Sequence, residues 1–278
     1  MTCNKVILFY EKHNDPHPPK TFVELMPLFK NMNINSICLE EPSDINLQEK
    51  TQNYEVNIKF LSECIGTNSL ESLCSQKILI STPIYHKGKI ISNYKTLPLN
   101  EQSNLLLYIN SIYKSYLEAT QENLKLATSI VKYKLNYCAM DLPESYRTKF
   151  ESENKKITPQ ERNDIRSLYM KDKILEACEA KGDVALLVGA SHFKLAQWLQ
   201  NEGIKNIYEY YIFNSPLVTL EGDNTEGCLR LKEHDHIEYC RDYQYKGMAI
   251  DLNENPNINT TELVGYHLLL SNIAANEL

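Results

Sequence analysis

The chain has 278 residues, of which 42% are hydrophobic and 23% are charged, so it can bury a sizeable core and fold by itself. Its 29 basic and 36 acidic residues give a formal net charge of −7, which disfavours binding to nucleic acid or to anionic membranes. We therefore expect a globular protein for which nucleic acid is an unlikely partner.

Eight cysteines are scattered along the chain, and no two of them have the spacing of a zinc knuckle or a redox motif. This pattern predicts reduced thiols in a cytosol. The apolar run near the N-terminus is too short for a signal peptide or a membrane span. The expected location is cytoplasmic, or a cytosol reached by a route that uses no signal peptide.

Six short apolar runs predict strands that are buried on both faces, as in a parallel sheet. They are Lys5–Tyr10, Asn35–Leu39, Lys77–Ser81, Asn136–Met140, Asp183–Val188 and Ile207–Phe213. Segments with helical spacing lie between them. The predicted fold class is therefore α/β, with a mostly parallel central sheet flanked by helices in a single domain over residues 1–278.

The helical segments differ in how clearly they begin and end. Residues 21–32 carry an apolar stripe, and residues 100–134 predict a helical insertion. Thr158, Pro159 and Glu161 form a capping-box pattern for a helix that runs to Ala180. Residues 214–259 predict irregular structure or short hairpin strands, and a last helix is expected over 261–275.

Polar side chains follow several of these strands. In an open parallel sheet, ligands bind beyond the carboxyl ends of the strands, so we expect these side chains to share one crevice. They are Glu11 and His13 after the first strand, Glu40 and Glu41 after the second, Asp141 after the fourth, and Ser191 and His192 after the fifth. Two imidazoles with carboxylates could bind a divalent metal ion through His13, Glu40 and His192, or activate water without a metal.

Each histidine also has an ordinary structural explanation. His13 lies in a proline-rich segment that we expect to be extended, and it could be an exposed loop residue. Gly189 permits a tight turn in which Ser191 caps the next helix and places His192 in its first turn. His192 could equally be a hydrogen-bonded core residue.

The position of each charged residue on its strand or helix indicates which role we expect for it. Glu40 and Glu41 are adjacent on a strand, so their side chains point to opposite faces and only one is expected to be catalytic, for which we choose Glu40. Glu41, Asp141 and Ser191 are expected to bind substrate. Arg162 shares a helical face with Ile165 and Tyr169, so it is expected to point inward and meet an anion, unless it reaches the edge of the domain.

The order of these motifs resembles the superfamily that groups erythromycin esterases, ChaN-like proteins, TraB and TIKI proteins, and a domain of the Pasteurella mitogenic toxin. The residues that carry the resemblance are Glu11-Lys12-His13, Leu39-Glu40, Glu161-Arg162-Asn163 and Gly189-Ala190-Ser191-His192. The resemblance covers about three quarters of the chain. It departs at Tyr10, where the first motif usually has glycine, and over residues 66–134, which have no counterpart.

The resemblance implies a hydrolase that cleaves an ester or peptide bond of a small-molecule or peptide substrate. Some members are metal-dependent, and the superfamily also contains a haem-binding group. In the leading hypothesis Glu40 or Glu11 activates water, His13 and His192 bind a metal or hold the reacting groups, and Arg162 stabilises negative charge. The alternative is a haem-binding or protein-interaction module, which Tyr10 keeps open. A third hypothesis is a bacterial effector or toxin component with a host protein partner.

Overall fold

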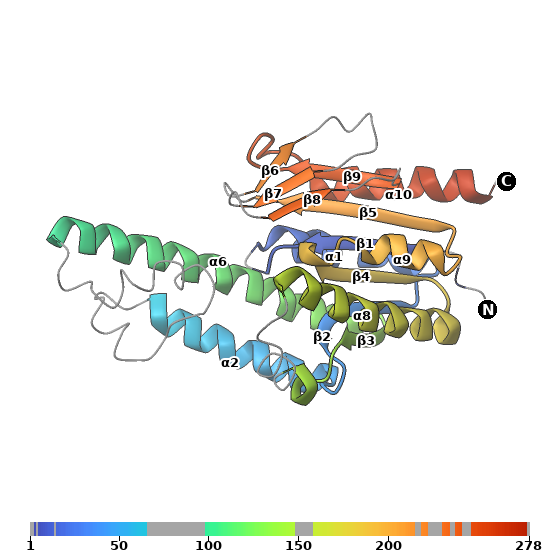
Figure 1. The fold of residues 1–278 in the computed structure, drawn as a ribbon, viewed down its shortest axis with the longest axis horizontal. Helices are drawn as coiled ribbons and strands as arrows, with labels where there is room; N and C mark the ends of the chain where they lie inside the picture. Colours follow the sequence, from blue (N-terminus) through green and yellow to red (C-terminus); the bar gives the residue numbers. More distant parts are fainter. Residues whose placement is uncertain are drawn as a thin grey trace.

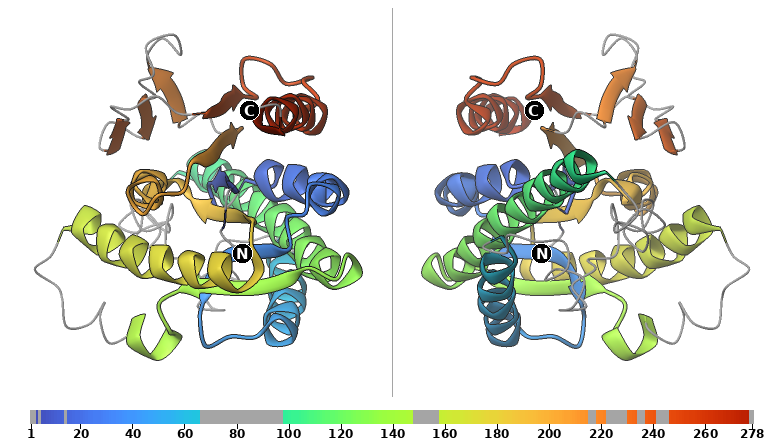
Figure 2. Two further views of the ribbon diagram at one scale, coloured as in Figure 1. Left: turned by 90° about the vertical axis from the view of Figure 1, so that its right-hand side faces the viewer. Right: turned by 90° about the vertical axis from the view of Figure 1, so that its left-hand side faces the viewer.

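The computed structural model describes residues 3, 5–13, 15–65, 98–147, 158–214, 218–221, 230–233, 237–240 and 246–276. It is an α/β fold in which a central sheet is covered by helices on both faces (Figure 1, Figure 2). The predicted fold class is therefore confirmed. The predicted strand at 77–81 lies outside the described residues.

The central sheet has six strands in the order β3-β2-β4-β1-β5-β9, and every neighbouring pair is parallel. The strands are β1 (Lys5–Glu11), β2 (Ser36–Pro42), β3 (Asn136–Asp141), β4 (Val184–Gly189), β5 (Asn206–Phe213) and β9 (Lys246–Asp251). Val6 to Phe9 and Val184 to Val188 are almost completely buried, because helices cover both faces of the central strands β1 and β4. All six carboxyl ends consequently lie at one edge.

One face of the sheet is covered by α1 (His17–Asn31), α10 (Thr260–Asn276) and the second half of α6 (Leu99–Lys132). Helix α1 begins at His17, earlier than the residue 21 expected from its apolar stripe. Pro18 and Pro19 lie in its first turn, where the fixed proline φ suits a helix and the missing N–H is not needed. The expectation that these prolines keep the segment extended is therefore wrong.

The other face is covered by α8 (Pro159–Lys181), the short 3-10 turn η2 (Ala190–His192) and α9 (Leu195–Asn201). The capping box at Thr158 is present: its hydroxyl accepts the N–H of Glu161, whose carboxylate accepts the N–H of Thr158. Met170, Ile174 and Cys178 repeat every four residues and are buried against the sheet. This repeat fixes which side of α8 faces inward.

Helix α2 (Leu47–Ile65), which the sequence analysis did not predict, packs along the first half of α6. Leu61, Cys64, Ile109 and Tyr113 form a small separate core between these two helices. Figure 1 shows the pair extending beyond one end of the sheet. Helix α2 starts at the carboxyl end of β2, so it stands beside the edge where the strands end.

The region after β5 contains β6 (Val218–Glu221), β7 (Arg230–Glu233) and β8 (Ile237–Cys240), which form a small antiparallel sheet. The sequence predicts irregular structure or short hairpin strands for this region, and the described residues contain the second of these. Strand β9 was not separated from them in the sequence, yet it joins the central sheet beside β5. At Gly247, with φ of 146°, an added Cβ would lie 1.9 Å from the Glu209 carbonyl oxygen, so only glycine allows this close pairing. No described helix is both long and apolar enough to span a membrane.

Candidate active site

The carboxylate of Glu40 lies at the centre of the groups gathered at the strand ends. Its Oε2 accepts the backbone N–H of Gly189 at 2.6 Å, and its Oε1 lies 3.1 Å from Nε2 of His192. Gly189 has an ordinary extended backbone, with φ of −60°. The reason for glycine is close approach, since an added Cβ would lie 2.9 Å from Glu40 Oε2 and 3.4 Å from His13 Nε2.

Arg166 on α8 links Glu40 to the end of β3. Its Nη2 donates to Glu40 Oε1 at 2.6 Å and to Asp141 Oδ2 at 2.5 Å, while its Nε donates to Asp141 Oδ1 at 3.1 Å. The bidentate contact with Asp141 fixes the plane of the guanidinium. Arg166 lines the cleft described below, and no described residue accepts a hydrogen bond from its Nη1.

His192 is buried behind Glu40, and its side chain is fully shielded from solvent. Its Nδ1 lies 2.6 Å from the hydroxyl of Ser167, which also donates to the Asn163 carbonyl at 2.7 Å. Because the hydroxyl donates its one proton to Asn163, it accepts from Nδ1 of His192, and the opposite ring nitrogen faces Glu40. His192 therefore holds Glu40 and cannot itself reach a substrate in the cleft.

The charges around Glu40 determine its ionisation. Burial alone would raise the pKa of this carboxyl, but His192, His13 and Arg166 outweigh burial and hold the pKa well below its usual range. A carboxylate that is 5% exposed, strongly ionised and already bound by three donors is a poor general base. Its geometry suits it to orient the groups around it.

His13 is the contrasting imidazole, because 65% of its side chain is exposed. It follows β1 in a turn, and its Nδ1 lies 3.2 Å from Oε1 of Glu11, which leaves Nε2 directed toward Gly189 and Glu40. Desolvation by the cleft walls lowers the pKa of His13, but the Glu11 hydrogen bond and the charges of Glu40 and Glu11 raise it to about 9. Water at the exposed ring screens part of this attraction.

Glu41 points away from Glu40, as expected for neighbouring residues of a strand. Its carboxylate pairs with Lys50 and accepts the hydroxyl of Tyr54 at 2.8 Å, both on α2. Burial raises the pKa of Glu41, although Lys50 opposes the change. The two glutamates therefore serve opposite walls of the cleft.

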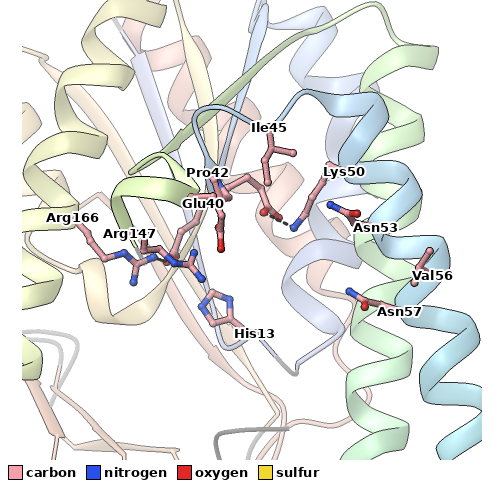
Figure 3. Close-up of a pocket in the computed structure, with 12 residues that line it drawn as sticks. His13, Glu40, Pro42, Ile45, Lys50, Asn53, Val56, Asn57, Arg147 and Arg166 are labelled. Carbon is pink, nitrogen blue, oxygen red and sulfur yellow. Dashed lines mark hydrogen bonds and ion pairs between the residues drawn. The ribbon is translucent and has the colours of Figure 1, made fainter. Parts of the chain in front are cut away.

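An open cleft of about 670 Å³ lies between α2 and the carboxyl ends of the strands. Figure 3 shows His13, Glu40, Arg147 and Arg166 pointing toward one another on one side, with the α2 side chains on the other. Its lining residues are His13, Glu40, Glu41, Pro42, Ile45, Lys50, Asn53, Val56, Asn57, Glu144, Arg147 and Arg166. A cleft of this size can hold a small molecule or a short stretch of peptide.

The candidates from the sequence divide into two groups. The structure brings together Glu11, His13, Glu40, Asp141 and His192, and it places Glu41 on the facing wall. Arg162 does not line the cleft, and its Nε is buried with no hydrogen-bond partner among the described residues. Ser191 lies in the 3-10 turn and caps neither η2 nor α9, because its own backbone is already helical.

Arg166 and Ser167 were missed because the inward face of α8 was assigned from Ile165 and Tyr169. Ile165 is 39% exposed, so it does not mark the inward face. Extending the buried Met170, Ile174 and Cys178 repeat back by four residues would have identified Arg166.

Tyr10 does not place a phenol in the cleft. Its ring stacks on Tyr211 with centroids 4.3 Å apart, and its hydroxyl donates to the buried Glu209 at 2.9 Å. The tyrosine that replaces the usual glycine therefore packs in the buried core. Tyr10 gives no support to the haem-binding alternative.

The proposed metal ligands do not fit a divalent ion as they stand. Glu40 Oε1 already accepts from the Arg166 guanidinium and lies beside His192, and Oε2 accepts the Gly189 N–H, so both oxygens are engaged by hydrogen-bond donors. Among the residues that the structure describes, no group of three or more histidine, cysteine or acidic side chains could hold a metal ion. We derive no step through a metal.

Comparison with known proteins adds little to this geometry. No protein-family profile and no curated protein matches the sequence. A solved structure described as the type III effector HopBA1 is similar to 89% of this chain over 88% of its own length, with 8% sequence identity and a TM-score of 0.38.

Proposed function

We propose that the protein hydrolyses an ester or peptide-type bond in the cleft, with His13 as the residue that transfers protons. The observation that carries this proposal is the contrast in exposure at the strand ends. His13 is largely accessible and held by one carboxylate, whereas Glu40, Asp141 and His192 are buried and paired with each other or with Arg166. A group must be accessible to exchange protons with substrate and water.

The contact with Glu11 sets the role of each ring nitrogen. A hydrogen bond to the Glu11 carboxylate requires a proton on Nδ1, so Nε2 is the nitrogen that exchanges its proton. In the proposed reaction, neutral His13 takes a proton from water while the water oxygen bonds to the substrate carbonyl carbon. The protonated ring then returns that proton to the leaving oxygen or nitrogen as its bond to carbon breaks.

Arg166 is the proposed donor to the oxyanion that forms during this attack. Its guanidinium is fixed by Glu40 and Asp141 before substrate arrives, so little reorganisation is needed. The same two carboxylates offset much of its charge. Its contribution would therefore be a directed hydrogen bond from Nη1.

The proposal can be tested with a panel of chromogenic esters and fluorogenic peptides. His13→Ala should lower kcat/KM by about 10²- to 10⁴-fold, the usual contribution of a positioned acid–base group. His17→Ala is the matched control, because His17 also pairs with a nearby carboxylate, Asp15, at 2.7 Å but does not line the cleft. Full activity in His13→Ala would refute the assignment.

The pH dependence gives a second test. If His13 acts as a base, kcat/KM should rise with pH to an inflection near the pKa of about 9. Glu11→Gln removes the strongest contribution that raises this pKa, so the inflection should move to lower pH. A profile that Glu11→Gln leaves unmoved would show that His13 is not the titrating base.

The haem-binding alternative has its own test. A Soret band on haem titration, without turnover of any substrate, would favour that alternative.

A further inference from the structure

The wall of the cleft across from His13 is formed by α2 and presents two asparagines. Asn53 and Asn57 lie one helical turn apart, and both are exposed and line the cleft. Figure 3 shows their amide groups projecting from α2 into the cleft. Neither amide has a hydrogen-bond partner among the residues that the structure describes. Both are therefore available to a ligand.

Helix stability does not account for these asparagines. Asparagine is a poor helix former, because its amide competes with the backbone for hydrogen bonds. Neither residue caps an end of α2, which runs from Leu47 to Ile65. The side chains that pack α2 against α6 include Leu61 and Cys64 and not the asparagines. The two amides thus have no part in the ends or the packing of the helix.

The spacing of the two amides matches that of an extended peptide. Four residues of α-helix rise about 6 Å. In an extended chain, the N–H and C=O groups of every second residue point to the same side, and this repeat is about 6.6 Å. An asparagine amide has both a donor and an acceptor, so it can bond the N–H and the C=O of one residue. Asn53 and Asn57 can therefore bind two successive residues of this repeat.

The other groups of this wall fit a neutral main chain with an apolar side chain. The charge of Lys50 is paired with Glu41, so the wall attracts neither sign of charge strongly. Val56 precedes Asn57, lines the cleft and is 66% exposed. An apolar side chain placed against Val56 removes surface of both groups from water.

We infer that the cleft binds a peptide in extended conformation, that Asn53 and Asn57 hydrogen-bond its main chain, and that Val56 selects an apolar side chain. The inference rests on the proposed function, because it names the substrate class of the same cleft. A peptide held on α2 lies between this helix and His13, which brings its peptide bonds beside the residue that transfers protons. A small ester has no main-chain repeat and cannot use both amides in this way.

The first experiment compares a fluorogenic octapeptide library with a small ester, 4-nitrophenyl butyrate. Asn53→Ala and Asn57→Ala should each lower kcat/KM for the peptides by about three- to tenfold, the loss of main-chain hydrogen bonds, with a much smaller effect on the ester. Alanine is the best helix former, so both variants should keep α2 folded. Asn104→Ala on α6 is the matched control, because Asn104 is also exposed on a helix but does not line the cleft.

The apolar contact is tested with the same library. Val56→Thr keeps the branched shape and adds a hydroxyl, so a preference for an apolar residue at one peptide position should weaken. Val131→Thr is the matched control, since Val131 is 67% exposed on α6 and does not line the cleft. A preference that Val56→Thr leaves unchanged would overturn the role of Val56.

A binding experiment separates this inference from the proposed function. Fluorescence polarisation of the labelled library should show binding to the unmodified protein and to His13→Ala. Asn53→Ala and Asn57→Ala should weaken it, and Asn104→Ala should not. Peptide binding without turnover of any substrate would overturn the hydrolase and keep the peptide site. Turnover of esters without peptide binding, or peptide turnover that both asparagine variants leave unchanged, would overturn the peptide site and keep the hydrolase.

Discussion

The site has two neighbouring parts that differ in exposure: one consists of buried charged groups that pair with each other, and the other is open to solvent. In what we call the floor, Glu40, Asp141, Arg166 and His192 are mostly buried and bind one another. In the mouth, the side chain of His13 is 65% exposed, and its Nδ1 lies 3.2 Å from one carboxylate oxygen of Glu11. Buried charges must be paired, so the groups of the floor use their interactions to stabilise the fold. The exposed group of the mouth can contact a ligand.

The strongest way to break this contrast is to remove the carboxylate at the centre of the floor. Glu40→Ala should lower the free energy of unfolding by about 3–5 kcal/mol, because a buried pair loses one partner. Guanidinium unfolding would measure the loss. Glu41→Gln, next along the same strand, should cost less, because its pair with Lys50 is 15–18% exposed and the new amide can still accept the Tyr54 hydroxyl. Equal losses of unfolding free energy in the two variants would show that Glu40 does not stabilise the fold more than Glu41 does.

The next effect concerns the space beside Glu40. Gly189→Ala places a methyl group 2.9 Å from Oε2 of a carboxylate that Arg166 and His192 hold in place. We expect a loss of about 1–3 kcal/mol in unfolding free energy from this overpacking. Gly265→Ala on α10 is the control, because its Cβ would meet the ends of two leucine side chains that can shift. A Gly189→Ala protein as stable as the unmodified one would contradict the tight floor.

A smaller loss should follow removal of the hydroxyl behind His192. Ser167→Ala leaves the buried Nδ1 of His192 without its partner at 2.6 Å, which should cost roughly 1–2 kcal/mol. Thermal unfolding would report the change as a lower Tm. Ser103→Ala, which removes an exposed hydroxyl bound to its own helix, should leave Tm nearly unchanged. Similar Tm values for the two variants would mean that His192 does not depend on Ser167.

The smallest expected effect is the pH-dependent contribution of His13, in the mouth, to the free energy of unfolding. The pKa of His13 is raised from 6.5 to about 9, so its charge stabilises the fold fully below 6.5 and this contribution is lost as pH rises through about 9. Because the ring is exposed, the contribution is small. The difference in unfolding free energy between the unmodified protein and His13→Ala should therefore shrink between about pH 6 and pH 10. A difference that grows with pH would reverse the sign of this linkage.

Several features of the fold could be predicted because they depend on local pattern. Apolar runs such as Asp183–Val188 identify buried strands, and the capping box at Thr158 fixes the start of α8. Parallel strands then bring their carboxyl ends to one edge, which is why His13, Glu40 and His192 could be expected together. Helix α2 and strand β9 were not predicted, since polar surface residues hide the helical pattern of α2 and a glycine-containing strand gives little signal for β9.

The sequence by itself determined the parallel α/β class, the meeting of polar side chains at the strand ends, and the divergence of the Glu40 and Glu41 side chains, because these follow from periods of two and about four residues along one segment. Only the tertiary structure decided that Arg166 binds Glu40 and Asp141, that His192 lies behind the carboxylate, and that His13 faces the cleft. Those facts depend on the rotation of α8 against the sheet and on contacts between segments more than 100 residues apart. No pattern within a single segment encodes them.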